Sequence, residues 1–287
     1  MQSPISHGAR DDLAGPPSSL VPVNGLRQRF ATAMLVIVPL AAIIFFTPRI
    51  YGVLLLSFMV LAGAWEWGGF FPKMNKPLRV AYVALIGIGM LIAWFGGGTA
   101  VMPVLWVAMV WWLFAFAWVL RFPTPVPVLL VLFGGLFVLV PGWLALARLH
   151  MQLGPQWLTF FFFVIAAADT GAYFSGKAFG RTRLAPKVSP GKTWEGALGG
   201  LVFVLLIAVA GAYWFGWSPI FMISLCLAVA LASVIGDLTI SMFKRHAHLK
   251  DSGSLFPGHG GVLDRIDSMS AGAPLFVIGL GWARSMA

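Results

Sequence analysis

The sequence has little charge and a single cysteine. Only 10% of its 287 residues are charged and 60% are hydrophobic, which excludes a soluble domain with an ordinary charged surface. The one cysteine, Cys226, lies in an apolar run, so no disulfide can form within the chain and a thiol mechanism has little support. The composition therefore predicts an all-α, polytopic integral membrane protein.

Acidic residues are also scarce. Nine Asp and Glu stand against 19 Lys and Arg, and the formal net charge is +10. The basic residues are scattered between apolar runs and form no single patch, so we expect no nucleic-acid partner. Membrane topology and acidic lipid headgroups explain the excess better, and we expect the lipid bilayer as a partner.

About nine apolar stretches are long enough to cross the hydrocarbon core as helices. Residues 1–30 are polar and do not match a cleavable signal peptide, so they predict a disordered cytosolic tail. We assign N-terminal transmembrane helices to 31–150 and a C-terminal transmembrane catalytic region to 151–287. The predicted spans are 31–47, 50–70, 80–96, 101–120, 126–147, 157–175, 196–216, 219–241 and 270–284.

The basic residues also predict an orientation. With the N-terminus in the cytosol, 16 of the 19 Lys and Arg fall on the cytosolic side, and only Arg49, Arg148 and Arg284 fall outside. This asymmetry is expected when cytosolic loops retain Lys and Arg. We therefore predict a multi-pass protein of the cell (inner) membrane whose charged C-terminal segments face the cytosol.

The first five predicted spans carry few ionisable groups and are interpreted as packing or lipid-facing helices. Glu66, in "GAWEWGGF", is the exception. A carboxylate within the membrane is a functional candidate, but this one lies near a cytosolic end where it can reach water. We leave its role unassigned. No convincing internal repeat is found, which weakens a transporter built from inverted halves.

The first polar segment of the C-terminal region is "AAADTGAYFSGKAFGRTRLAPKVSPGKTWEG". It runs from a helix with Asp169 into a Gly-, Lys- and Arg-rich loop that begins near Lys177 and can cradle phosphates. Retention of positive charge in the cytosol explains the basic residues equally well. "SPGKT" also invites a P-loop interpretation, but Pro186 stands where the first glycine is required and no strand is predicted before it.

Two further segments contain acidic residues. In "SVIGDLTISMFKRHAHLKD", Asp237, Ser241 and Lys244 share one helical face, where Asp237 either binds a cation or pairs with Lys244. In "PGHGGVLDRID", Asp264 and Asp267 accompany a flexible backbone. These acids suit Mg²⁺ bound through carboxylates and substrate phosphates. Zinc through the histidines, or a plain salt-bridge network, stays open at this point.

The segment "SMFKRHAHLKDSGSLFPGHGGVLDRID" resembles the signature of the phosphatidate cytidylyltransferases, also called CDP-diacylglycerol synthases. That signature runs Ser, two residues, Lys-Arg, four residues, Lys-Asp, a Gly-containing spacer, Pro-x-His-Gly-Gly and Asp-Arg-x-Asp. "DTGAYFSGKAFG" and "SPGKTWEG" resemble the same family. The resemblance implies Mg²⁺-dependent transfer of CMP from CTP to phosphatidate in phospholipid biosynthesis, with a second, monovalent cation left open.

The resemblance also implies site residues. The catalytic set is Asp237, Asp264, Lys244 and Arg245, and the metal ligands are Asp237, Asp264 and Asp267. The implied substrate-binding set is Asp169, Lys177, Lys187, Ser189, Lys192, Ser241, His259, Gly260, Gly261 and Arg265.

Two other function classes stay under consideration. A cation-coupled transporter would also place acids in helices, but it requires ionisable residues along a path across the bilayer, whereas these lie on one side. Another lipid-phosphate transferase, such as a lipid kinase or a CDP-alcohol phosphotransferase, is the third class, although the Asp-Gly-x-x-Ala-Arg motif of the latter is absent. Self-association into a homo-oligomer is left open.

Overall fold

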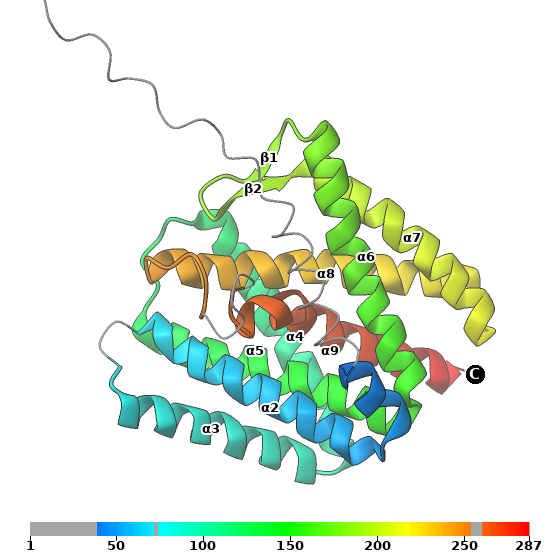
Figure 1. Ribbon diagram of the computed structural model, residues 1–287, viewed down its shortest axis with the longest axis horizontal. Coiled ribbons are helices and arrows are strands. Elements are labelled where there is room, and N and C mark those ends of the chain that lie inside the picture. Colours follow the sequence, from blue (N-terminus) through cyan, green and yellow to red (C-terminus); the bar gives the residue numbers. More distant parts are fainter. Residues whose placement is uncertain (1–38, 72–73, 254–259, 287) are drawn as a thin grey trace, which may run out of the picture. The chain divides into compact units, whose positions relative to one another are not determined.

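The computed structural model describes residues 39–71, 74–253 and 260–286. Contacts divide the chain into two compact units, Met1–Ile43 and Ile44–Ala287. Of the first unit only residues 39–43 are described, and they are helical. The second unit contains the helices α2 (Arg49–Trp67), α3 (Lys76–Phe95), α4 (Gly98–Arg121), α5 (Val128–Arg148), α6 (Pro155–Phe179), α7 (Trp194–Phe215), α8 (Pro219–His246) and α9 (Leu263–Met286) (Figure 1).

These helices confirm the predicted all-α membrane fold. Among the described residues, eight helices are long and apolar enough to cross a membrane. They correspond to the second to ninth predicted spans, while residues 31–38 of the first, 31–47, lie outside the described residues. Large apolar side chains such as Phe95, Val110 and Leu206 are exposed on the helices, as surfaces in contact with lipid require.

Two predicted helix boundaries were wrong in a way that matters for the site. The sixth span continues to Phe179, so Lys177 lies on α6 and not in the following loop. The ninth helix begins at Leu263, so Asp264 lies in its first turn. In both cases polar residues occupy a helix end, where hydropathy falls while helical hydrogen bonding continues.

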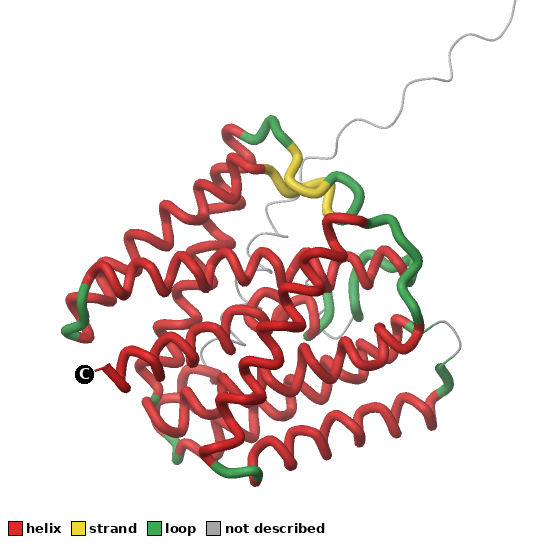
Figure 2. The backbone as a smooth tube through the Cα atoms, turned by 180° about the vertical axis from the view of Figure 1, so that it is seen from behind, coloured by secondary structure: helices red, strands yellow, loops and turns green. Residues whose placement is uncertain are grey.

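A short β-hairpin interrupts the helical pattern between α6 and α7. Strand β1 (Arg183–Ala185) pairs antiparallel with β2 (Ser189–Thr193), and Arg183 lies opposite Thr193. Figure 2 shows these strands beside the ends of the two helices that they connect. Thr193 ends β2 and caps α7, because its Oγ1 accepts a hydrogen bond of 3.1 Å from the Gly196 amide. Our expectation that no strand precedes "SPGKT" was therefore wrong, because β1 precedes it. "GKT" itself is the end of a strand that leads into a helix cap and not a loop, so Pro186 and the backbone both differ from a P-loop.

Helices α6 and α7 pack closely because small residues line their contact. A Cβ atom at Gly200 would meet the backbone carbonyl of Ala168, and one at Gly171 would meet that of Gly199. Small residues allow helix backbones to approach closely in membranes, where apolar burial does not drive helices together. The region between α6, α7 and α8 is therefore built from backbone and small side chains.

Helix α9 contacts α2, α4, α5, α6 and α8. The earlier helices are joined to one another by side chains that donate to backbone carbonyls: Trp67 Nε1 donates to Val131 (2.9 Å) and the Tyr82 hydroxyl to Leu132 (3.0 Å). Trp67 also lies against Phe243 of α8, with ring centroids 5.3 Å apart. The division at about residue 150 stays a prediction about function, since helices on both sides of it contact α9.

Candidate active site

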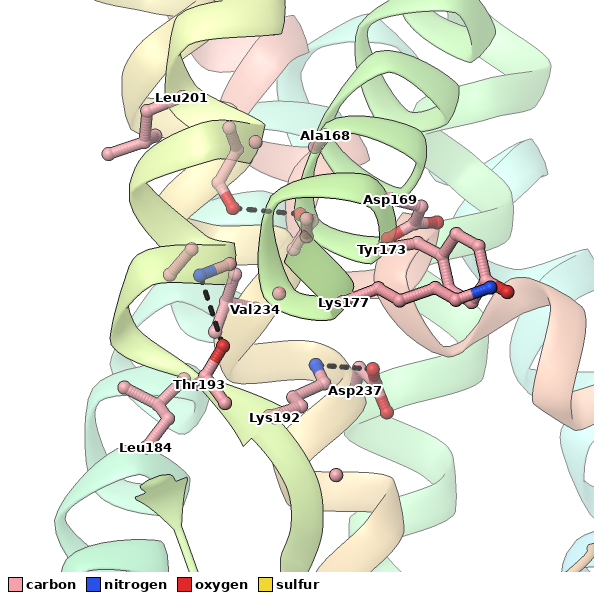
Figure 3. A pocket seen from close by; sticks show the side chains of 18 residues that line it. Ala168, Asp169, Tyr173, Lys177, Leu184, Lys192, Thr193, Leu201, Val234 and Asp237 are labelled. Atoms are coloured by element: carbon pink, nitrogen blue, oxygen red, sulfur yellow. Dashed lines mark hydrogen bonds and ion pairs between the residues drawn. The ribbon is translucent and has the colours of Figure 1, made fainter. Parts of the chain in front are cut away.

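A pocket of about 420 Å³ lies between α6, the hairpin, α7 and α8. Its polar lining includes Asp169, Lys177, Lys192 and Asp237, and Figure 3 shows Lys192 of β2 directed at Asp237 of α8. Its apolar walls are small or aliphatic: Ala168, Ala172, Ala197, Leu201, Ala230 and Val234. The pocket therefore combines a charged part with an apolar part.

The ion pair of Lys192 and Asp237 joins the hairpin to α8. Both side chains are 27% exposed. The second oxygen of Asp237, Oδ1, accepts a hydrogen bond of 3.2 Å from the Ser241 hydroxyl one turn later. The predicted face of Asp237 and Ser241 is thus confirmed, but the lysine that pairs with Asp237 is Lys192 and not Lys244.

The hairpin is also anchored by Glu195 and Arg245. The Glu195 carboxylate accepts hydrogen bonds from the backbone amides of Arg181 and Thr182, each at 3.1 Å. Arg245 donates through Nε to the Val188 carbonyl at 3.2 Å and through a terminal nitrogen to the Leu249 carbonyl at 3.3 Å. Arg245, which we predicted to be catalytic, therefore holds the hairpin backbone against the end of α8.

A second ion pair joins α8 to α9. Lys244 Nζ donates to Asp264 Oδ1 at 2.7 Å, and the two side chains are only 11% and 13% exposed. The other oxygen, Oδ2, accepts hydrogen bonds of 3.0 Å from the amides of Ser252 and Gly261. Gly260 precedes this contact with φ at +78°, a conformation that favours glycine. The carboxylate of Asp264 is thus held on both oxygens.

Two further carboxylates lie in the electrostatic field of these ion pairs. Asp267, which is buried, is repelled by Asp237 and attracted by Lys192 and Lys244. Asp169 lines the pocket with Lys192 and Asp237, is repelled by Asp237 and is attracted by Lys192 and Arg265. The structure therefore brings together acids from α6, α8 and α9 with cations from β2, α8 and α9.

The remaining predicted residues that the structure describes are not among those that line the pocket. Lys187 is exposed in the hairpin turn, Ser189 begins β2, and neither is among the lining residues. Arg265 is exposed on the first turn of α9, where it has an interaction partner. His259 lies outside the described residues.

Carboxylate oxygens in this cluster suit a hard cation, but they do not form a complete metal cage. Within residues 39–71, 74–253 and 260–286, no group of three or more His, Cys, Asp or Glu side chains is placed to hold a metal ion. Asp237 has acceptor capacity beyond one hydroxyl and one lysine, because an ionised carboxylate has about four acceptor positions. Such an arrangement fits Mg²⁺ held by one or two carboxylates together with substrate phosphates.

Glu66 of α2 is the residue whose place the sequence left unassigned. It is 8% exposed, and its carboxylate accepts hydrogen bonds from the Ser252 hydroxyl (2.8 Å) and from the amides of Val262 (3.0 Å) and Leu263 (2.9 Å). The Glu66 side chain is therefore buried within the protein and is not solvated at the membrane surface, as its position near a helix end had allowed. The available signal was a carboxylate in an apolar span, but its partners are not visible from local sequence.

A family model and individual known proteins were each compared with this chain, and both comparisons indicate the same family. The model of the cytidylyltransferase family matches residues 27–282. A protein named phosphatidate cytidylyltransferase from Pseudomonas aeruginosa is 42% identical over 271 residues, which are 90% of this chain and 97% of the relative. Proteins of the same name from Haemophilus influenzae (37% identical; 88% of this chain, 97% of the relative) and Rickettsia felis (32%; 80% and 89%) are also similar.

Proposed function

Since the chain belongs to the cytidylyltransferase family, we propose that it transfers CMP from CTP to phosphatidate. The products are CDP-diacylglycerol, a precursor for phospholipid synthesis, and pyrophosphate. Phosphatidate is amphiphilic, and the pocket between α6, α7 and α8 has a charged part beside apolar walls. The observation that carries the proposal is this pocket with the Lys192–Asp237 pair at its charged part.

The reaction requires neutralisation of the phosphate charge more than it requires a strong general base. An anionic phosphate oxygen of phosphatidate attacks the α-phosphorus of CTP, a new P–O bond forms, and the bond between the α-phosphorus and the bridging oxygen to the β-phosphate breaks. Lys192 and Lys177 line the pocket, and we assign the binding of the phosphates to them. Lys244 of α8 holds Asp264 of α9 in an ion pair. Positioned cations and in-line geometry are the main requirements for such a transfer.

We propose Asp237 as the principal Mg²⁺ ligand, with Asp267 and Asp169 beside it in the same charged cluster. When bound, Mg²⁺ supplies Lewis-acid stabilisation of the phosphate oxygens. Asp264 stays a predicted ligand: two amides take up its Oδ2, and a metal ion would share Oδ1 with Lys244. Binding of Mg²⁺ to Asp237 requires a smaller rearrangement, because only the part-exposed Lys192 occupies its Oδ2.

We also propose that the site faces the cytosol of a bacterial inner membrane. The hairpin, the end of α8 and the start of α9 carry most of the basic residues of the C-terminal region. Lys and Arg are retained on the cytosolic side of membranes, where CTP is present. Labelling of a cysteine introduced at Lys187, in a Cys226→Ala background, tests this orientation: an impermeant thiol reagent should modify it only when it reaches the cytosolic face.

The decisive experiment uses purified protein in mixed micelles with phosphatidate and Mg²⁺. We expect CDP-diacylglycerol and pyrophosphate with CTP, and no phosphorylated lipid with ATP. Product from ATP alone would instead identify a lipid kinase. Cation flux into liposomes without any CTP turnover would overturn the proposal in favour of a transporter.

A further inference from the structure

Glu66 accepts three hydrogen bonds from two stretches that lie far from it in the chain. Its Oε1 binds the Val262 amide, and its Oε2 binds the Leu263 amide and the Ser252 hydroxyl. The two amides belong to the start of α9, where unpaired N–H groups and the helix dipole favour a negative charge. Glu66 therefore caps α9 from another helix and ties Ser252 to the same point.

Asp264 binds the same two stretches. Its Oδ2 accepts from the amides of Ser252 and Gly261, while its Oδ1 receives Lys244. Glu66 and Asp264 thus act in parallel on Ser252 and on the backbone immediately before and within the first turn of α9. Any movement of this backbone away from Glu66 moves Asp264 with it.

The backbone leaves little free space around the Glu66 carboxylate. A Cβ atom at Gly253 or at Gly261 would clash with its oxygens. The contact therefore depends on glycine at two positions that flank the hydrogen-bonded groups. A carboxylate held this closely, with three donors, specifies the position of its partners more sharply than a solvated one.

We propose that Glu66 is a positioning residue that fixes Asp264 of α9 relative to Lys244 of α8. It touches neither ion pair directly; it acts through the backbone amides that carry Asp264. The inference rests on the proposed cytidylyltransferase function. Misplacement of a catalytic group by about 1 Å can cost on the order of 100-fold in rate, so loss of this support should appear in kcat.

Glu66→Gln tests the proposal, because it keeps the shape of the side chain and replaces one acceptor oxygen by a donor that faces other donors. We expect kcat to fall about 10- to 100-fold, with a much smaller change in KM for CTP. Glu66→Asp keeps both acceptor oxygens and should retain more activity. Ser252→Ala removes one of the three donors and should lower kcat less than Glu66→Gln does.

Tyr82→Phe is the matched control, since it also removes one hydrogen bond of a buried side chain, between α3 and α5. It should lower the unfolding temperature and leave kcat unchanged. Hydrogen exchange supplies a readout independent of activity: the amides of Val262 and Leu263 should exchange faster in Glu66→Gln than in the wild type and in Tyr82→Phe.

Three results would overturn the inference: a wild-type kcat in Glu66→Gln, a lower kcat without faster exchange at Val262 and Leu263, or an equal loss of kcat in Tyr82→Phe. Absence of CDP-diacylglycerol formation in the wild-type protein is a different result. It would remove the proposed function, whereas an active wild type beside a fully active Glu66→Gln removes only the positioning role.

Discussion

The two lysine–aspartate pairs of helix α8 differ in their surroundings. Asp237 pairs with Lys192 of the hairpin, and both side chains are 27% exposed. Lys244, two turns further along α8, pairs with Asp264 of α9, and these side chains are 11% and 13% exposed. The first pair lies beside the pocket, whereas the second joins two helices.

The difference in exposure indicates that the two pairs have different roles, although their chemistry is alike. A part-exposed pair has a modest net energy, so an incoming phosphate or cation can replace either partner at little cost. A buried pair whose carboxylate also accepts two amide hydrogen bonds is held in one geometry. We therefore expect the Lys192–Asp237 pair to rearrange on substrate binding and the Lys244–Asp264 pair to stay in place.

The largest effect is expected from Asp264→Asn. It should abolish formation of CDP-diacylglycerol, and it should also lower the free energy of unfolding by about 3–5 kcal/mol because Lys244 keeps a buried, unpaired charge. Adding Lys244→Gln should recover stability without activity, as measured by thermal unfolding in detergent and by product formation from CTP. Recovery of activity in the double variant would contradict a catalytic role for the pair.

Lys192→Met should separate activity from stability. We expect kcat to fall on the order of 100-fold, since a cation placed for phosphate charge is lost. The free energy of unfolding should change by less than about 1 kcal/mol, because the pair is part-exposed. Parallel kinetic and unfolding measurements on Lys192→Met and Lys244→Met make the comparison direct. Equal destabilisation of the two variants would show that the pairs do not differ as described.

Arg245→Lys asks whether Arg245 binds phosphate or holds the hairpin. Lysine keeps the positive charge but cannot reproduce two hydrogen bonds from one planar group to the carbonyls of Val188 and Leu249. If Arg245 anchors the hairpin, Arg245→Lys and Arg245→Gln should lose kcat to a similar degree, about tenfold. Wild-type activity in Arg245→Lys together with a severe loss in Arg245→Gln would assign it to phosphate binding.

The smallest effect is expected from Ser241→Ala. Its hydroxyl donates a 3.2 Å hydrogen bond to Asp237, and a typical hydrogen bond contributes about 0.5–1.5 kcal/mol. A loss of a few-fold in activity should follow, measured best as the Mg²⁺ concentration that gives half-maximal rate. A loss as large as that of Lys192→Met would mean that Ser241 contacts the substrate itself.

Part of the site was predictable because it depends on short-range spacing. Asp237 and Ser241 are four residues apart on a helix, and their side chains meet as expected. Lys177 and Lys192, both from the segment predicted to bind phosphates, line the same pocket, and phosphate binding itself stays a prediction. The partner of Asp237 was not predictable in this way, because Lys192 lies on a hairpin whose position depends on Glu195 and Arg245.

Glu66 is the clearest example of a residue whose contacts the local sequence does not predict. Its three hydrogen-bond partners lie 186, 196 and 197 residues away along the chain. Apolar surroundings in the sequence marked the residue as unusual but carried no information about which loop or helix it contacts. Only the packing of α2 against α9 decides that contact.

The sequence by itself determined the membrane class, the helical fold, the family resemblance and the residues that carry charge. Those properties follow from apolar length, residue type and fixed spacing, which are local. The tertiary structure alone decided which of those charges meet, which pair is buried, and that Glu66 supports the start of α9. The physical reason is that a buried charge needs partners, and helix packing brings these partners from anywhere in the chain.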